Sequence, residues 1–105
     1  MGSTMDMFAL NQAELGRLCR RYRVLRLDLF GSAATGNFRP QDSDVDLLVE
    51  FEPLPPGAYA DAYFGLLQSL EALVGASVDL VAEEAIKNPY FRQAVEQTKV
   101  LLYAA

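Results

Sequence analysis

Two aspartates inside an apolar segment are the first residues of this 105-residue sequence that could carry chemistry. Asp44 and Asp46 stand in "DVDLLVEF", where the alternation of apolar residues predicts a β-strand over residues 44–51. Residues i and i+2 of a strand project to the same face, about 6.5 to 7 Å apart. Two like charges held side by side are unfavourable unless a cation lies between them, and carboxylate oxygens are ligands that Mg²⁺ prefers. The pair therefore predicts a divalent metal site.

A third aspartate, Asp79, lies alone in the apolar segment "SVDLVA", which predicts a strand over residues 77–82. If that strand lies beside the strand at 44–51, Asp79 joins the other two aspartates on one face. Three carboxylates there could hold two metal ions about 3.5 to 4 Å apart, an arrangement that serves phosphoryl or nucleotidyl transfer. A calcium-binding EF-hand loop beginning at Asp42 is the alternative, and it fails because Leu47 stands where that loop needs glycine.

A Gly31-Ser32 pair supplies the second half of the pattern. It follows the apolar segment "VLRLDLF" and precedes the small residues of "SAATG". We expect a tight turn into a short helix whose backbone amides face an anion, with Gly31 letting a phosphate approach and the Ser32 hydroxyl donating to it. A plain turn with a capping serine is the alternative for the pair by itself. The Asp-x-Asp strand that follows favours the phosphate site.

The segment before this turn predicts a strand over residues 24–30, in which leucines alternate with Arg26 and Asp28. A period of two indicates one covered face. We expect the leucines, Leu25 among them, to face the core. Asp28 is then expected to be a solvent-facing strand charge rather than a fourth metal ligand.

The sequence contains no histidine and one cysteine. The absence of histidine excludes Ser-His-Asp and Cys-His nucleophile systems and histidine-bound zinc. Cys19 cannot form a disulfide within the chain, and its helical spacing with Leu15 and Leu18 predicts a buried core position. Chemistry in this chain must therefore use carboxylates, hydroxyls, backbone amides and metal ions.

The charge of the chain limits its partners. A net charge of -5 argues against direct binding of nucleic acid, because phosphate contacts need clustered Lys and Arg. The basic cluster from Arg17 to Arg23 falls on the outer side of a predicted helix, as is typical of a solvated face. No apolar run is long enough to cross a bilayer and no secretory signal is recognisable, so we expect a cytoplasmic protein without a membrane partner.

The remaining periodicities indicate the elements that position these groups. Apolar spacings of three and four predict amphipathic helices over about residues 11–22 and 59–74, and Asn88-Pro89 predicts the start of a last helix. The final "KVLLY" continues that helix or forms a short edge strand. We expect an α/β or α+β fold in one domain over residues 1–105, in which residues 1–4 are a flexible start or an expression remnant.

The combination of Gly31-Ser32, "SDVDLLVEF" and "VDLV" closely resembles the minimal nucleotidyltransferases, the small branch of the DNA-polymerase-β-like nucleotidyltransferase superfamily. The resemblance covers the chain from the first helix to "NPYF" and implies a small mixed β-sheet flanked by helices. It implies that Gly31 and Ser32 bind the triphosphate of ATP. It further implies that Asp44 and Asp46 bind two Mg²⁺ ions, and that Asp79 completes the metal site and helps to deprotonate the acceptor hydroxyl.

The resemblance also implies a partner. Members of this branch are commonly paired with a HEPN-domain ribonuclease toxin, for which they act as antitoxin, and some transfer AMP from ATP to a tyrosine of that toxin. The expected activity is therefore Mg²⁺-dependent transfer of AMP to a toxin hydroxyl. The chain has no residues left for an acceptor-binding domain, so we expect another protein to present the acceptor.

One position departs from the family pattern. Thr35 stands where the family usually carries a basic residue, and Arg39 is the nearby candidate to contact the phosphates instead, with a solvated loop charge as its alternative. The departure leaves two other hypotheses open. One is an antitoxin that neutralises its toxin by binding alone, and the other is nucleotidyl transfer to a small molecule such as an antibiotic.

Overall fold

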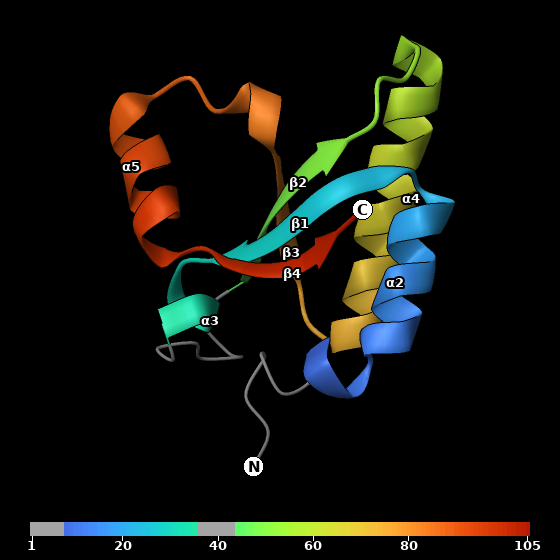
Figure 1. The fold of residues 1–105 in the computed structure, drawn as a ribbon, viewed down its shortest axis with the longest axis horizontal. Helices are drawn as coiled ribbons and strands as arrows, with labels where there is room; N and C mark the ends of the chain where they lie inside the picture. Colours follow the sequence, from blue (N-terminus) through green and yellow to red (C-terminus); the bar gives the residue numbers. More distant parts are fainter. Residues whose placement is uncertain (1–7, 36–43) are drawn as a thin grey trace.

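The computed structural model describes residues 8–35 and 44–105, and Figure 1 shows the fold. Its elements are α2 (Gln12–Arg21), β1 (Val24–Phe30), α3 (Ser32–Thr35), β2 (Val45–Phe51), α4 (Pro56–Val74), β3 (Val78–Ala82), the 3-10 helix η1 (Glu83–Ala85), α5 (Pro89–Thr98) and β4 (Val100–Ala104). The three predicted strands and the short helix after Gly31 are confirmed. The end of the chain forms the edge strand, not a longer helix. The predicted start at residues 1–4 lies outside the described residues.

The strands form one mixed sheet in the order β3-β2-β1-β4. Strand β1 pairs antiparallel with both β2 and β4, whereas β2 and β3 are parallel. A parallel pair needs a crossover connection, and α4 provides it between β2 and β3. Helices α2 and α4 cover one face of the sheet and α5 lies on the other, as Figure 1 shows. The predicted mixed sheet flanked by helices is confirmed.

The main core lies between the sheet and the α2–α4 layer. Alternate residues of β1, β2 and β3 point into it, and they meet apolar residues at helical spacing on α2 and α4. The most completely buried of these side chains are Leu15, Cys19, Leu27, Leu29, Val45, Leu47, Val49, Leu66 and Leu70. Cys19 has the predicted core position, and burial raises the pKa of its thiol to about 12. The thiol therefore packs as a small apolar group.

The start of β1 differs from the expected alternation. The pairing of β1 with β2 shifts register between Val24 and Arg26. An irregularity of this kind turns the residues before it relative to the rest of the strand. Val24 is consequently buried at 2% exposure, whereas Leu25 is 37% exposed. The prediction that Leu25 faces the core is wrong.

The opposite face carries a smaller apolar cluster under α5. It is formed by Phe30, Leu48, Ile86 and Val95. The Phe30 ring meets Phe91 of α5 edge to face, with the ring centroids 5.9 Å apart.

This second layer explains why the prediction of a solvent-facing Asp28 is wrong. Asp28 is 1% exposed and accepts hydrogen bonds from the Arg26 guanidinium, the shortest at 3.0 Å. A buried carboxylate needs such a partner. The period-two pattern placed Asp28 on the correct face, but it gave no sign that a second layer would cover that face.

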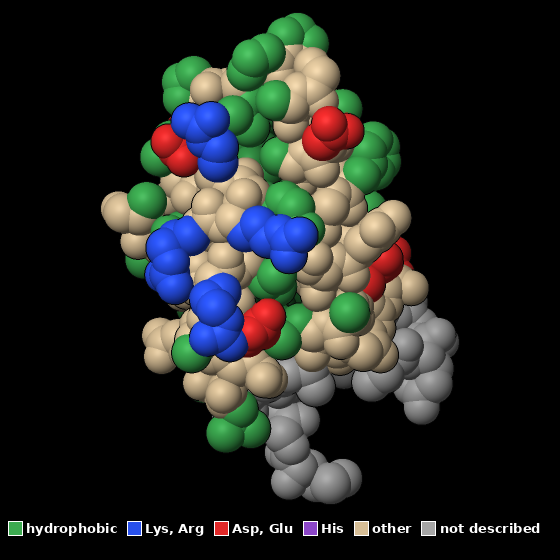
Figure 2. Space-filling view, turned by 90° about the vertical axis from the view of Figure 1, so that its right-hand side faces the viewer, with side chains coloured by type: hydrophobic (Ala, Val, Ile, Leu, Met, Phe, Trp, Pro, Cys, Tyr) green, Lys and Arg blue, Asp and Glu red, His purple; other side chains and the backbone are tan. Residues whose placement is uncertain are grey.

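The basic cluster lies on the outer surface of the α2 side. Figure 2 shows this face, where Lys and Arg side chains gather over the helices. Arg17, Arg20, Arg21 and Arg23 are all exposed, which confirms the prediction of a solvated face. Arg17 pairs with Glu14, and Arg23 lies 3.5 Å from Glu52. Within the described ranges, no helix is long and apolar enough to cross a membrane.

Candidate functional site

The register of the sheet brings the predicted aspartates together. Asp46 of β2 lies directly opposite Asp79 of β3 in the parallel ladder. Directly paired residues of neighbouring strands project to the same face. Asp44 precedes β2 by one residue, and it is exposed, as is Asp79, whereas Asp46 is partly buried. The three carboxylates therefore gather at one end of the sheet face that also carries α5.

The charges at this place are not balanced by the described part of the chain. Burial raises the pKa of Asp46 above its ordinary value, and the negative charges of Asp79 and Asp44 raise it further. None of the described Lys or Arg residues forms an ion pair with Asp46. The electrostatics thus favour either a proton or an added cation here.

The donor set fits Mg²⁺ in the form in which nucleotide enzymes usually hold it. Across residues 8–35 and 44–105, no three acidic, His or Cys side chains are already arranged as a metal cage. Mg²⁺ seldom uses such a cage, and it takes one or two carboxylates and completes its shell with water and substrate phosphates. The opposed Asp46 and Asp79, with Asp44 beside them, offer hard oxygen ligands of this kind.

The Gly-Ser turn lies against these carboxylates. Phe30, the last residue of β1, pairs with Asp46, so Gly31 leaves the sheet beside it. Gly31 has a φ of 71°, and a Cβ atom at this position would lie 2.5 Å from Asp46 Oδ2. A side chain here would be strained by the backbone and would also collide with the carboxylate. Glycine therefore allows the turn and the carboxylate to approach each other.

Helix α3 begins at this turn and presents amides near the aspartates. The Gly31 carbonyl oxygen accepts hydrogen bonds from two amides of α3, at 3.1 and 3.2 Å. The amides of Ser32 and Ala33 open the helix, and the first amides of a helix have no carbonyl partner within it. The Gly31 amide instead donates to Thr98 Oγ1 at 3.1 Å. The expected anion-facing amides are thus those of Ser32 and Ala33, without that of Gly31.

The predicted phosphate contact at Arg39 lies outside the described residues. Thr35 is exposed at the end of α3, and its hydroxyl donates to the Ser32 carbonyl oxygen at 3.3 Å. The Thr35 side chain therefore adds no positive charge beside the turn.

Sequence reasoning missed the role of Tyr63. Tyr63 lies on α4, and its hydroxyl donates to the Leu80 carbonyl oxygen at 2.5 Å. Burial and the nearby charge of Asp79 raise the pKa of Tyr63. The bond ties α4 to β3 at Leu80, the residue that follows Asp79. Helical spacing alone could not reveal it, because it depends on which strand lies beside α4.

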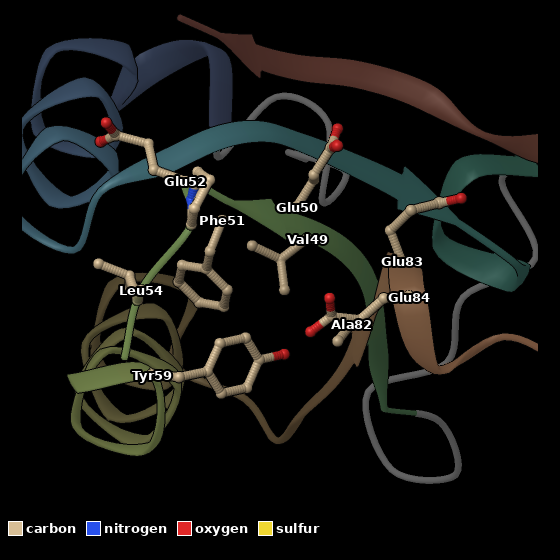
Figure 3. Close-up of a pocket in the computed structure, with 10 residues that line it drawn as sticks. Val49, Glu50, Phe51, Glu52, Leu54, Tyr59, Ala82, Glu83 and Glu84 are labelled. Carbon is tan, nitrogen blue, oxygen red and sulfur yellow. The ribbon is translucent and has the colours of Figure 1, made fainter. Parts of the chain in front are cut away.

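A cavity of about 350 Å³ lies at the other end of β2 and β3. Four glutamates are among its lining residues: Glu50, Glu52, Glu83 and Glu84. Figure 3 shows Tyr59 and Glu84 facing each other across it. Burial and the hydrogen bond with Glu84 raise the pKa of Tyr59. The cavity lacks the features that favour a phosphate, whereas the aspartate end of the sheet lies against the Gly31 turn and the first amides of α3. The aspartate end is therefore the better candidate for a nucleotide.

Comparisons with known proteins identify the proteins that this chain resembles. The family model described as a nucleotidyltransferase domain matches residues 15–102. A Methanocaldococcus jannaschii protein assigned as a protein adenylyltransferase is 35% identical over 77 residues, or 73% of this chain and 75% of the relative. The protein adenylyltransferase MntA of Thermococcus cleftensis is 39% identical over 71 residues, or 68% of each chain.

Solved structures share the fold. A chain assigned as a minimal nucleotidyltransferase superimposes with a TM-score of 0.74 at 32% identity, covering 94% of this chain and 95% of that one. The MNT antitoxin fold also matches in a complex with a tri-AMPylated HEPN toxin from Shewanella oneidensis. There the TM-score is 0.61 at 23% identity, covering 93% of this chain and 73% of that one.

Proposed function

The chain belongs to the nucleotidyltransferase domain family, and we propose that it transfers AMP from ATP to a hydroxyl of a partner protein with Mg²⁺. We further propose that the partner is a HEPN-domain toxin, that the acceptor is a tyrosine, and that the chain acts as antitoxin. The observation that carries the proposal is the pairing of Asp46 with Asp79 beside the close approach of Gly31. The two protein adenylyltransferase relatives support the reaction class.

The residues have distinct parts in the proposed reaction. Asp44, Asp46 and Asp79 would hold Mg²⁺, which when bound activates an attacking oxygen and stabilises a leaving one. The Ser32 hydroxyl, with the amides of Ser32 and Ala33, would bind the triphosphate. Asp79 is exposed and so can meet the acceptor hydroxyl and help to take its proton. The acceptor oxygen bonds to the α-phosphorus as the bond to pyrophosphate breaks in line.

Support for the partner comes from the shared fold of an MNT antitoxin that is bound to an AMPylated HEPN toxin. The proposed acceptor site is open on the side of Asp79 and Asp44, since both side chains are exposed. An acceptor brought by another protein could therefore reach the carboxylates without any rearrangement of β2 or β3.

Labelling tests the proposal directly. The chain, Mg²⁺, α-labelled ATP and the purified toxin are incubated together, and label on the toxin is expected. The Asp44→Asn/Asp46→Asn double variant should give none. Glu50→Gln is the matched control, because it makes the same change on the same face of β2, away from the aspartate end, and should label normally. Labelling by the double variant at the wild-type rate would contradict the proposal.

Thr35 favours one second candidate, an antitoxin that acts by binding alone. The exposed end of α3 carries no cation at this position, which weakens the attraction for a triphosphate. In that case the double variant would still neutralise the toxin as well as the wild type does. Measuring labelling and toxin neutralisation on the same samples separates the two functions.

A further inference from the structure

The Gly31 amide is held by a side chain from a distant part of the sequence. It donates to Thr98 Oγ1 at 3.1 Å, across 67 residues. Thr98 is the last residue of α5, and its own hydroxyl donates to the Ala94 carbonyl oxygen at 3.1 Å. A hydroxyl has one hydrogen and two acceptor lone pairs, so both bonds can form together. The Thr98 side chain thus links the end of α5 to the turn after β1.

The pairing of β1 with β4 explains why these two residues meet. Val100 lies opposite Leu29 in the antiparallel ladder. Continuing this register by two residues places position 98 opposite position 31. Residue 98 belongs to α5 and not to β4, so no strand carbonyl is available there. The Thr98 hydroxyl accepts the bond that a backbone carbonyl would accept in a continued ladder.

Two further contacts hold Gly31 in place, one at its carbonyl oxygen and one at its Cα. Its carbonyl oxygen accepts from the amides of α3, and its Cα faces the Asp46 carboxylate so closely that no Cβ would fit. A movement of Gly31 would therefore change two things at once. It would tilt the first amides of α3, and it would alter the contact between the turn and Asp46.

We propose that Thr98 is a positioning residue for the nucleotide. By holding Gly31, it sets the direction of the Ser32 and Ala33 amides relative to Asp46. This inference rests on the proposed function, because those amides are the proposed phosphate donors. Thr98 touches neither the nucleotide nor the acceptor in this role and acts through Gly31.

Two substitutions separate the hydroxyl from the shape of the side chain. Thr98→Val keeps the branched shape and removes the acceptor, whereas Thr98→Ser keeps the hydroxyl. Loss of one hydrogen bond of ordinary strength corresponds to a change of about three- to tenfold in an equilibrium constant. We expect Thr98→Val to raise the KM for ATP by about this factor, to leave the KM for the toxin unchanged, and Thr98→Ser to restore the wild-type value.

Glu96→Gln is the matched control. It breaks the exposed ion pair between Glu96 and Lys99, 3.0 Å long, in the same turn of α5 without touching Gly31. Its KM for ATP should equal that of the wild type. A purely structural role of Thr98 would lower the melting temperature and reduce kcat with the folded fraction, and it would leave the KM for ATP unchanged.

Two measurements, one of amide exchange and one of nucleotide affinity, distinguish failure of this inference from failure of the proposed function. Amide exchange measured by NMR should show a protected Gly31 amide in the wild type and faster exchange in Thr98→Val. The affinity for Mg·ATP is measured on the same samples with a fluorescent ATP analogue. Equal affinity of the wild type and Thr98→Val would overturn the positioning role and leave the proposed function intact. A wild type that binds no nucleotide would overturn both.

Discussion

Asp28 and Asp46 lie on the same face of the sheet, on adjacent strands, and differ in how their charges are balanced. Asp28 is buried on the face that carries α5 and pairs with Arg26, which comes from the same strand. Asp46 faces two further carboxylates, and the described residues provide it with no ion pair. Among the described residues, Asp28 has a partner of opposite charge and Asp46 has none.

The difference teaches how a structural carboxylate can be told from a functional one. A buried charge with a partner in the chain has its desolvation cost offset within the fold. A cluster of like charges without a partner lowers the stability of the folded state until a proton or a cation arrives. Stability should therefore depend on the pair in β1, whereas activity should depend on the aspartates of β2 and β3.

The largest effect is expected for activity at Asp46. Asp46→Asn removes a proposed Mg²⁺ ligand, so transfer of AMP to the toxin should fall by at least about a hundredfold, or about 2.7 kcal/mol in the barrier. The measurement is kcat/KM with labelled ATP and toxin. A loss of less than about threefold would place the reaction elsewhere.

The Asp28–Arg26 pair should show the opposite behaviour. Arg26→Leu leaves the buried Asp28 carboxylate without its partner, and because Arg26 is itself half exposed, we expect a loss of about 1 to 3 kcal/mol in the free energy of unfolding. Urea unfolding measures it. The KM for ATP of the folded variant should stay at the wild-type value. A large rise in that KM would contradict the assignment of Asp28 as a structural carboxylate.

Gly31 tests the contact between the turn and the functional aspartate. Gly31→Ala places a Cβ against Asp46 Oδ2 and requires a positive φ of an L-residue, so we expect a loss of about 1 to 2 kcal/mol in stability together with weaker ATP binding. Gly75→Ala is the matched control. Gly75 also has a positive φ but has open space around its missing Cβ, so only the backbone cost should appear.

The smallest effect is a gain in stability at Asp46. The folded-state pKa of Asp46 is raised, so its contribution to stability is present below the unfolded pKa and is lost as the pH rises through the folded pKa. In EDTA at pH 7, Asp46→Asn should therefore be more stable than the wild type by up to about 1 kcal/mol, after allowance for solvent screening. This difference in the free energy of unfolding should shrink as the pH falls towards 4. An Asp46→Asn variant that is less stable than the wild type at pH 7 would contradict the claim that the charge of Asp46 is unbalanced.

The sequence predicted the parts of the site that depend on local pattern. The period of two in "DVDLLVEF" and "SVDLVA" located the strands and the face of their aspartates, and Gly31 marked the turn. Features that depend on the packing of distant elements were missed. The burial of Asp28 requires α5 to cover the second face, and the bond from Gly31 to Thr98 requires the register of β4.

The most direct test of the central account is Mn²⁺ binding, followed by electron paramagnetic resonance, with a non-hydrolysable ATP analogue present. The wild type should bind Mn²⁺ together with the nucleotide, and the Asp44→Asn/Asp46→Asn variant should leave Mn²⁺ in solution, as the free ion and as its complex with the nucleotide. Equal Mn²⁺ binding by the two proteins would show that these aspartates do not hold the metal, and would contradict the account.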